Sequence, residues 1–559
     1  MNKHTCFTAI LISTVFPAQI VSAQGVYDIP ADEAQLADVR TRIARTAEAM
    51  GISIYEYLPV IPDSAFNNLT AGSSAAGAAA VSRPAPLRMP PLTPAPVPTP
   101  EQPGQPRLPP GFSLPEPISY WGTAVTVWYA LGAQISDNAP WSKTPTFEQI
   151  SERVAKASIS SAFPARKAGQ PSLFTDAGFV KELEQVTGSA FVDGNSVRFL
   201  IDGGEAFRVK DDLIKNAKKS LLISSWAFYD DITGYETARM LIDKKKQGLE
   251  IKIMVDRKVI SGHGKKVIKM MEDAGIEVLR YQEAGRSNDY WHVKIIIADD
   301  KHAVVGGMNF GDVYSHKDPN NVKWRDTDAL YSGPAALATR ELFAGLWNEK
   351  AGEAGLRTIA SRPAQSPAFD GGSARVAVVL QNPPQDSPIL ISIIKAMYGA
   401  TRNINIENAY FVALPVVSKA VLDARARGVE VNILTNSKES IDPEGKVIVD
   451  AVYKCLVPLT YSGANIYLYN GDTLHSKFMT VDGIFADIGS YNLHPRGERY
   501  DTEVNINIMD PVSVAQLDQA FHKDLAGSRL VKSAAELGEK PGWLSTVVSE
   551  YFYAQLGRK

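Results

Sequence analysis

Two long stretches of the chain alternate short apolar runs with amphipathic segments in the same order. Short apolar runs are typical of buried strands, and apolar positions spaced by about three to four residues indicate helices. The first stretch predicts a helix at 206–218, a strand at 221–223, a helix at 234–246, a strand at 251–255, a helix at 266–274 and a strand at 277–280. The second predicts a helix at 389–399, a strand at 404–406, a helix at 414–427, a strand at 430–434, a helix at 446–456 and a strand at 466–468. This alternation predicts an α/β fold.

The repeated order predicts two similar lobes with mixed sheets, at 188–365 and 366–559, related by a pseudo-twofold axis. A chain of 559 residues is also longer than a single core usually grows. We expect the active site to lie between the lobes. The second lobe is expected to end in a helix at 543–552, which packs on the core or, alternatively, dips into a membrane interface.

The N-terminal part has a different character. Residues 1–23 resemble a secretory signal peptide, with Lys3, an apolar run at 7–16 and an A-x-A-like cleavage site at 21–23. The alternative, an N-terminal membrane anchor, requires a longer apolar run of roughly 20 residues. We therefore expect an exported protein, either periplasmic or secreted.

Residues 24–70 are expected to form a helical segment, and 71–117 an Ala/Pro-rich linker. Dense proline favours an extended polyproline tether, and the alternative is a ligand for a proline-binding module. Residues 118–187 are interpreted as a helical lead-in to the first repeat, with helices at 147–157 and 176–186. Its function cannot be inferred from the sequence.

Composition narrows the classes of partner. The chain has 58 Lys and Arg against 61 Asp and Glu, and no stripe of basic and aromatic residues runs along it. We therefore expect no stable nucleic-acid partner. Removing the signal would leave Cys455 without a second cysteine, so no internal disulfide is expected. The sequence does not identify protein partners.

The candidate chemistry lies in a motif that occurs twice with identical spacing. The first copy consists of His292, Lys294, Asp299, Gly306, Gly307 and Asn309, and the second of His475, Lys477, Asp482, Gly489, Ser490 and Asn492. On a strand, residues two apart point to the same face, so each His would stand beside its Lys. Paired histidines suit phosphodiester chemistry, because one imidazole attacks phosphorus while the other protonates the leaving oxygen. The lysines and the amides of both asparagines would hold the phosphoryl oxygens.

The other motif residues are assigned supporting roles. Asp299 and Asp482 are expected at hairpin turns, where they support the fold. The small pairs, Gly306-Gly307 and Gly489-Ser490, would let the backbone approach the phosphate. Asp326 and Glu503 are candidates for orienting the imidazoles, but the sequence does not show which acid faces which histidine. No cluster has metal-ligand spacing, so neither a metal nor another cofactor is expected.

These motifs resemble those of the phospholipase D superfamily, and the Gly-Gly and Gly-Ser pairs look most like its bacterial cardiolipin-synthase branch. The likeness runs from about 188 to about 524 and extends to Trp324-Arg325-Asp326-Thr327 with Gly333-Pro334, to Glu503-Val504-Asn505 with Asp510-Pro511, and to Asn408-Ala409-Tyr410-Phe411. The resemblance implies phospholipase D-like lobes, with His292 as nucleophile and His475 as general acid. The near symmetry of the two copies leaves the reverse assignment open.

Two departures from the family shape the expected function. The chain has a signal-like segment and a linker where membrane-resident cardiolipin synthases carry transmembrane helices. In addition, Leu493-His494-Pro495-Arg496-Gly497 lacks the serine that usually follows the arginine, which puts acceptor handling in doubt. We expect an exported phosphodiesterase that releases phospholipid head groups at a membrane surface through a covalent phosphohistidine. The alternatives are a cardiolipin-synthase-type phosphatidyltransferase, a nuclease of the same superfamily, and a catalytically inactive binding module.

A glycine- and lysine-rich segment lies outside both motifs. Gly262-His263-Gly264-Lys265-Lys266 suggests a phosphate-binding loop but lacks its spacing. We expect a solvated loop that leads into a helix.

Overall fold

The computed structural model describes residue 145 and residues 147–282, 289–361, 371–384, 386–443, 445 and 448–538. The predicted signal peptide at 1–23, the helical segment at 24–70, the linker at 71–117 and the C-terminal helix at 543–552 lie outside the described residues.

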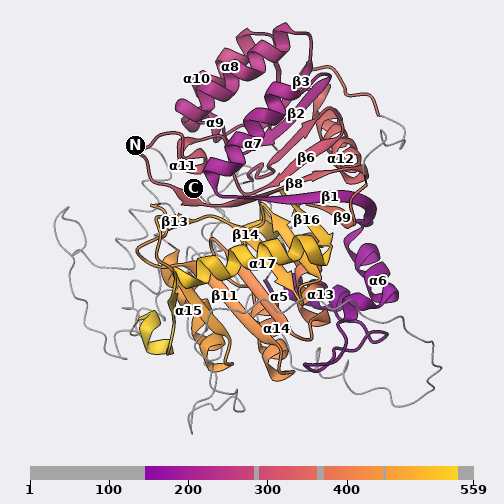
Figure 1. Cartoon of the computed structure of the whole chain (residues 1–559), viewed down its shortest axis with the longest axis vertical. Coiled ribbons are helices and arrows are strands. Elements are labelled where there is room, and N and C mark those ends of the chain that lie inside the picture. The colour runs from indigo at the N-terminus through magenta and orange to yellow at the C-terminus, as the bar shows by residue number, and fades with distance from the viewer. Residues whose placement is uncertain are drawn as a thin grey trace, which may run out of the picture.

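One mixed sheet runs through both halves of the protein (Figure 1). It contains 15 strands in the order β17-β12-β11-β10-β14-β15-β16-β9-β1-β8-β6-β5-β2-β3-β4. The first half contributes β1 (Val192–Ile201), β2 (Ser220–Ser225), β3 (Glu250–Asp256), β4 (Glu277–Tyr281), β5 (Ile295–Ala298), β6 (His302–Gly306) and β8 (Thr327–Ser332). The second contributes β9 (Ala374–Gln381), β10 (Asn403–Asn408), β11 (Glu430–Asn436), β12 (Asn465–Tyr469), β14 (Lys477–Val481), β15 (Phe485–Gly489), β16 (Glu503–Met509) and β17 (Arg529–Leu530).

The two halves have the same topology. Counted outward from the centre, the first runs β1-β8-β6-β5-β2-β3-β4 and the second β9-β16-β15-β14-β10-β11-β12. The halves join where β1 and β9 pair antiparallel. A second link is the two-stranded parallel sheet of β7 (Trp324–Arg325) and β13 (Thr473–Leu474). The predicted fold of two similar α/β lobes is confirmed, and a continuous sheet joins them.

Helices cover both faces of this sheet. The first half carries α7 (Gly203–Asn216), α8 (Ile232–Lys246), α9 (Ile260–His263), α10 (Lys265–Asp273), α11 (Asp312–Ser315) and α12 (Pro334–Ala351), and the second α13 (Pro388–Gly399), α14 (Pro415–Ala426), α15 (Val449–Tyr461), α16 (Arg496–Arg499) and α17 (Pro511–Ala526). Successive strand residues face opposite layers. On β2, Leu221 and Ile223 join the core under α7, α8 and α10, whereas Leu222 joins the core under α12 and α17. The core under α12 and α17 contains residues of both halves, so the lobes are not packed independently.

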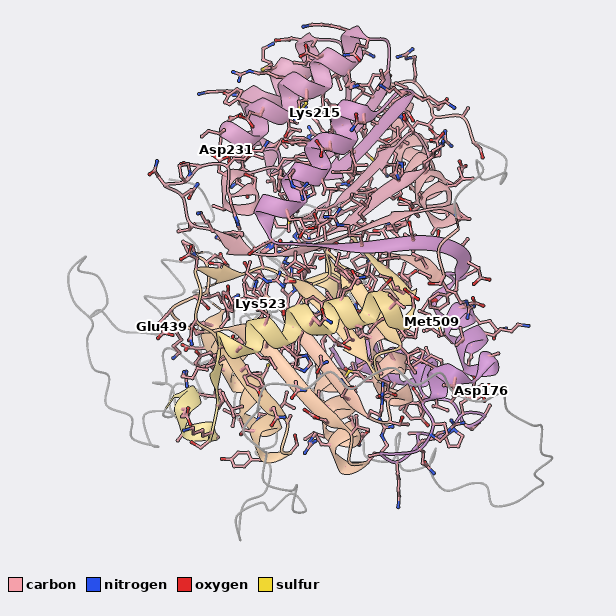
Figure 2. All side chains as sticks on the ribbon, in the orientation of Figure 1. Asp176, Lys215, Asp231, Glu439, Met509 and Lys523 are labelled. Carbon is pink, nitrogen blue, oxygen red and sulfur yellow. The ribbon has the colours of Figure 1, made fainter. Side chains whose placement is uncertain are left out.

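The lead-in helices α5 (Phe147–Ser158) and α6 (Ala177–Thr187) form as predicted but pack on the second lobe. Figure 2 shows Asp176, at the start of α6, near Met509 and far from Lys215. The reason lies in α13, which is apolar around nearly its whole circumference and must be covered on every side. Its buried Lys395 pairs with Glu182 of α6 at 2.7 Å.

None of the helices in the described ranges combines the length and apolar character that a bilayer crossing requires.

Candidate active site

Both motif histidines lie at the junction of the lobes, in irregular segments just before a strand. His292 precedes β5 and His475 precedes β14. The prediction that they lie on the strands themselves is therefore wrong, because each backbone turns to reach the other lobe. The N–H of His292 donates to the carbonyl oxygen of Thr502 at 3.0 Å, and the N–H of His475 donates to that of Arg325 at 2.7 Å.

Each imidazole is bound by a carboxylate of the opposite lobe. The Nδ1 atom of His292 lies 2.8 and 3.0 Å from the two carboxylate oxygens of Glu503. The Nδ1 atom of His475 lies 2.7 Å from Oδ2 of Asp326. Each contact occupies Nδ1 and leaves Nε2 for chemistry. At His475 the partner is Asp326, and its ionised carboxylate can only accept, so the Nδ1 proton points to it. The structure thus resolves the pairing that the sequence left open.

The two carboxylates differ in their surroundings. Burial raises the pKa of Glu503 well above its usual range, against the influence of Lys294 and of the Ser490 hydroxyl. Burial also acts to raise the pKa of Asp326, but His475 and Lys477 outweigh it, so that pKa lies below its usual value. The charge of Asp326 is therefore the better maintained of the two.

The motif lysines are buried beside their histidines. Nζ of Lys294 donates to the carbonyl oxygen of His292 at 2.8 Å, and Nζ of Lys477 donates to that of His475. Burial, together with repulsion from Lys477, lowers the pKa of Lys294 to about 7, and burial lowers that of Lys477 to about 8. A bound phosphodiester anion would compensate this repulsion.

The imidazoles are also kept neutral by burial. Burial lowers the pKa of His475 to about 4, with a further decrease from Lys477 and an opposing increase from Asp326. Burial together with both lysines lowers the pKa of His292 well below its usual value. A neutral imidazole with a free Nε2 lone pair is the form that attacks phosphorus.

The small residues of the motif make room for neighbouring polar side chains, and their expected role toward phosphate stays a prediction. A Cβ added to Gly307 would lie 2.3 Å from Oδ1 of Asp326. A Cβ added to Gly306 would likewise meet Asp328 at 2.1 Å. Ser490, the counterpart of Gly307, donates its hydroxyl to Glu503 at 2.5 Å and so fixes that carboxylate. Gly489 makes room for Asn505, whose Oδ1 would lie 2.2 Å from an added Cβ.

The asparagines of the two motifs differ. The amide of Asn309 is engaged at both ends, since it donates to the hydroxyl of Tyr314 at 3.0 Å and accepts from Ser225 at 3.3 Å. The carbonyl oxygen of Asn492 is buried and has no hydrogen-bond partner in the described structure. Their predicted donation to a phosphoryl oxygen stays a prediction, and only Asn492 has an unengaged end.

The motif aspartates lie in hairpin turns, as expected, with φ angles of 55° at both Asp299 and Asp482. The carboxylate of Asp299 accepts backbone N–H groups of residues 218–220 at 2.7 to 3.1 Å. Asp482 accepts those of residues 401–403 at 2.7 to 3.2 Å. These bonds fix the start of β2 and β10, so the aspartates support the fold.

Aromatic residues that the motif did not indicate surround the histidines. The ring of Trp226 lies 6.1 Å from that of His292, and the rings of Trp324 and Tyr314 both lie 5.2 Å from that of His475. Trp226 directly follows β2 and Trp324 begins β7. Both tryptophans lie near the end of a predicted strand or beside a motif segment, and this position in the sequence could have identified them as site residues.

The glycine-rich segment at 262–266 is not the expected loop, because α9 ends at His263, α10 begins at Lys265, and only Gly264 lies between the two helices. The carboxylate of Asp230 accepts the N–H groups of Lys266 and Val267, so the start of α10 is already capped.

Comparison with known proteins agrees with this geometry. The family model described as "Cardiolipin synthase, PLD-like domain" matches residues 211–346 and 393–525. The major cardiolipin synthase of Bacillus subtilis (strain 168) is 28% identical over 364 residues, which cover 64% of this chain and 74% of that protein. Cardiolipin synthase 2 of Bacillus anthracis is 30% identical over 339 residues, which cover 59% of this chain and 65% of that protein.

Among solved structures, the phosphatidylserine synthase of Haemophilus influenzae Rd KW20 shares the fold, with a TM-score of 0.54. It is 17% identical, and the match covers 66% of this chain and 97% of that one. With both motifs intact at the junction of two matching lobes, the chain belongs to the phospholipase D superfamily, in its cardiolipin-synthase branch, and is an enzyme of phospholipase D-type phosphodiester chemistry.

Proposed function

We propose that this protein is a phosphatidyltransferase of the cardiolipin-synthase type, which acts at a phospholipid membrane surface. The observation that carries the proposal is the pair of imidazoles, each held by a carboxylate of the other lobe and flanked by a buried lysine. The names of the relatives favour phosphatidyl transfer as the reaction.

His292 is assigned as the nucleophile and His475 as the general acid. The general acid must carry a proton on Nε2 when the leaving group departs, so it needs a carboxylate that stabilises an imidazolium. Asp326 keeps its charge and acts to raise the pKa of His475, whereas burial favours the neutral form of Glu503. His292, beside the carboxylate with the raised pKa, is better suited to attack as a neutral base.

The reaction then takes two balanced steps. In the first, His475 enters as an imidazolium, supported by Asp326 and by the bound phosphodiester anion. Nε2 of His292 forms a bond to phosphorus, the bond to the head-group oxygen breaks, and that oxygen takes the Nε2 proton of His475. In the second, an acceptor hydroxyl gives its proton to His475 while its oxygen attacks phosphorus and the bond to His292 breaks. Lys294 and Lys477 would neutralise the phosphoryl oxygens in both steps.

The acceptor decides between transfer and hydrolysis. The sequence alone favours water as the acceptor, because residues 1–23 resemble an export signal and the chain has no segment predicted to span a membrane. The relatives are named as synthases, so we rank transfer to a lipid hydroxyl first and hydrolysis second. Export stays a prediction, since it depends on residues 1–23, outside the described structure.

The test is incubation of the purified protein with phosphatidylglycerol vesicles, followed by mass spectrometry of the products. We expect cardiolipin and glycerol from the wild type and from the control His522→Gln, whose side chain is exposed on α17. His292→Asn and His475→Asn should give neither product. Phosphatidic acid as the main product would establish hydrolysis instead. Cleavage of plasmid DNA with untouched lipid would identify a nuclease.

A further inference from the structure

A third histidine, His494, lies within the site and is not part of either motif. It is 6% exposed, and its ring centroid lies 6.3 Å from that of Tyr410, whose ring lies 6.5 Å from that of His475. The rings of His475 and His494 thus both neighbour Tyr410, and a charge on His494 would lower the pKa of His292.

The turn that carries His494 is held firmly. The N–H of His494 donates to the backbone carbonyl oxygen of Asn492 at 2.7 Å, which closes a three-residue turn around Leu493. Leu493 packs in the core, and its N–H donates to the side chain of Asn408 at 3.1 Å. The side chains on either side of Leu493, those of Asn492 and His494, are thereby fixed.

Both flanking side chains have a buried polar atom without a partner. Nδ1 of His494 and Oδ1 of Asn492 make no hydrogen bond in the described structure. A buried polar atom left unpaired costs roughly 1–3 kcal/mol, so each one in a native structure requires an explanation, and inside a catalytic site that explanation can be a bound ligand. The carbonyl oxygen of Asn492 can only accept, so it requires a donor. A phosphoryl oxygen cannot be that donor, whereas a hydroxyl group can.

The repeat shows that the motif does not need this imidazole. Two residues after the motif asparagine, the second copy has His494 and the first has Gly311. In the first copy a Cβ would meet the ring of Tyr229 at 2.7 Å, so no side chain fits there. The histidine is therefore an asymmetric addition to one side of a nearly symmetric site.

We propose that His494, together with the side-chain oxygen Oδ1 of Asn492, forms the acceptor subsite, which binds the hydroxyl group that attacks the phosphatidyl-histidine. The inference rests on the proposed function, because it assigns the second step of that reaction. In that step the hydroxyl proton still passes to His475, and His494 orients the oxygen toward phosphorus. Burial lowers the pKa of His494 to about 4, so its imidazole is neutral and able to accept a hydrogen bond at neutral pH.

The test compares the wild type with His494→Ala and His494→Gln. In phosphatidylglycerol vesicles with an added primary alcohol, three quantities are measured: phosphatidyl-alcohol, phosphatidic acid and the initial burst of released glycerol. We expect His494→Ala to lower the ratio of phosphatidyl-alcohol to phosphatidic acid by roughly three- to tenfold, the size of one hydrogen bond. The glycerol burst, which reports the first step, should stay within about threefold of the wild type. His494→Gln, which keeps a hydrogen-bonding side chain, should recover part of the ratio, and His522→Gln should match the wild type.

A parallel decrease of both products at a constant ratio would overturn the inference, because it would show a purely structural role. If His494→Ala does not fold, an unchanged ratio in His494→Gln overturns it equally. A wild type that makes phosphatidic acid but no cardiolipin would refute the proposed lipid acceptor alone, since the added alcohol still tests His494.

Discussion

The assignment of the two histidines can be tested through the carboxylates that hold them. Asp326→Asn keeps the size of the side chain and removes the charge that supports a protonated His475. Its carboxylate accepts from Nδ1 of His475 at 2.7 Å and from the N–H of Thr327 at 2.8 Å. Glu503→Gln is the matched change on the opposite side, beside His292.

The structure gives the expected magnitudes. A hydrogen bond to a charged group contributes roughly 1.5–3 kcal/mol, so its loss from Asp326 should slow the first step by roughly 10- to 200-fold. Burial favours the neutral form of Glu503, which an amide resembles. A neutral hydrogen bond contributes roughly 0.5–1.5 kcal/mol, so Glu503→Gln should slow this step by only about two- to tenfold.

The assay uses two donor lipids that differ in their leaving group. Phosphatidylglycerol releases an alkoxide that needs a proton, whereas phosphatidyl-p-nitrophenol releases a phenolate that does not. With the second donor, the burst rate of Asp326→Asn should return to within about threefold of the wild type. The smaller loss in Glu503→Gln should persist with both donors, because the nucleophile acts on each.

The opposite pattern would reverse the assignment. If the nitrophenyl donor restores Glu503→Gln and leaves Asp326→Asn slow, His475 is the nucleophile. If neither variant loses more than about twofold with phosphatidylglycerol, the carboxylates do not position the imidazoles. Thermal unfolding of both variants separates these results from a loss of fold.

Three further predictions concern stability and charge. Asp482→Asn should lower the free energy of unfolding by roughly 1–3 kcal/mol, measured in urea, because buried N–H groups lose their acceptor, while lipid turnover at a permissive temperature stays within about twofold. Inhibition by dimethyl phosphate should weaken as the pH rises from 7 to 8, because Lys294 and Lys477, with pKa values of about 7 and about 8, lose their charge in this range. An inhibition constant that does not change from pH 6 to 9 would contradict this. Burial raises the pKa of Asp487 from 3.8 to about 7, so its ionisation destabilises the folded state as pH rises from about 4 through 7, and Asp487→Asn should raise the melting temperature at pH 8 more than at pH 5.

The order of strands and helices was predictable from the sequence because it depends on local periodicity. The turns at Asp299 and Asp482 were also predictable, since acidic residues at the ends of apolar runs favour tight turns. The packing of α5 and α6 on the second lobe was not predictable, because it depends on the apolar surface of α13, which is far away in the sequence. The joining of both lobes into one sheet depends on the pairing of β1 with β9, which no local pattern encodes.

The roles within the site were only partly predictable for a related reason. The sequence identified Asp326 and Glu503 as candidate partners of the histidines. It did not show which acid faces which histidine, because the spacing of the motifs is compatible with both pairings. The choice depends on two long-range contacts. His292 and Glu503 are 211 positions apart in the sequence, and His475 and Asp326 are 149 positions apart. The sequence also does not show that the carboxylate of Asp326 fills the space beside Gly307.

The crossed contacts also explain how a nearly symmetric sequence can support an asymmetric reaction. Neither lobe has a complete site, because each imidazole would lose its carboxylate if the lobes were separated. The two histidines therefore differ through residues of both lobes, which meet at the junction. The His292 side combines Glu503 with the hydroxyl of Ser490, in an environment that favours a neutral base.

The His475 side has the opposite combination. There the counterpart of Ser490 is Gly307, which lets Asp326 approach closely and keep its charge beside the general acid. His494, which has no side-chain counterpart at Gly311, belongs to the same lobe as His475. Under the proposed assignment, one half of the repeat attacks phosphorus, and the other moves the proton of the leaving group and of the acceptor.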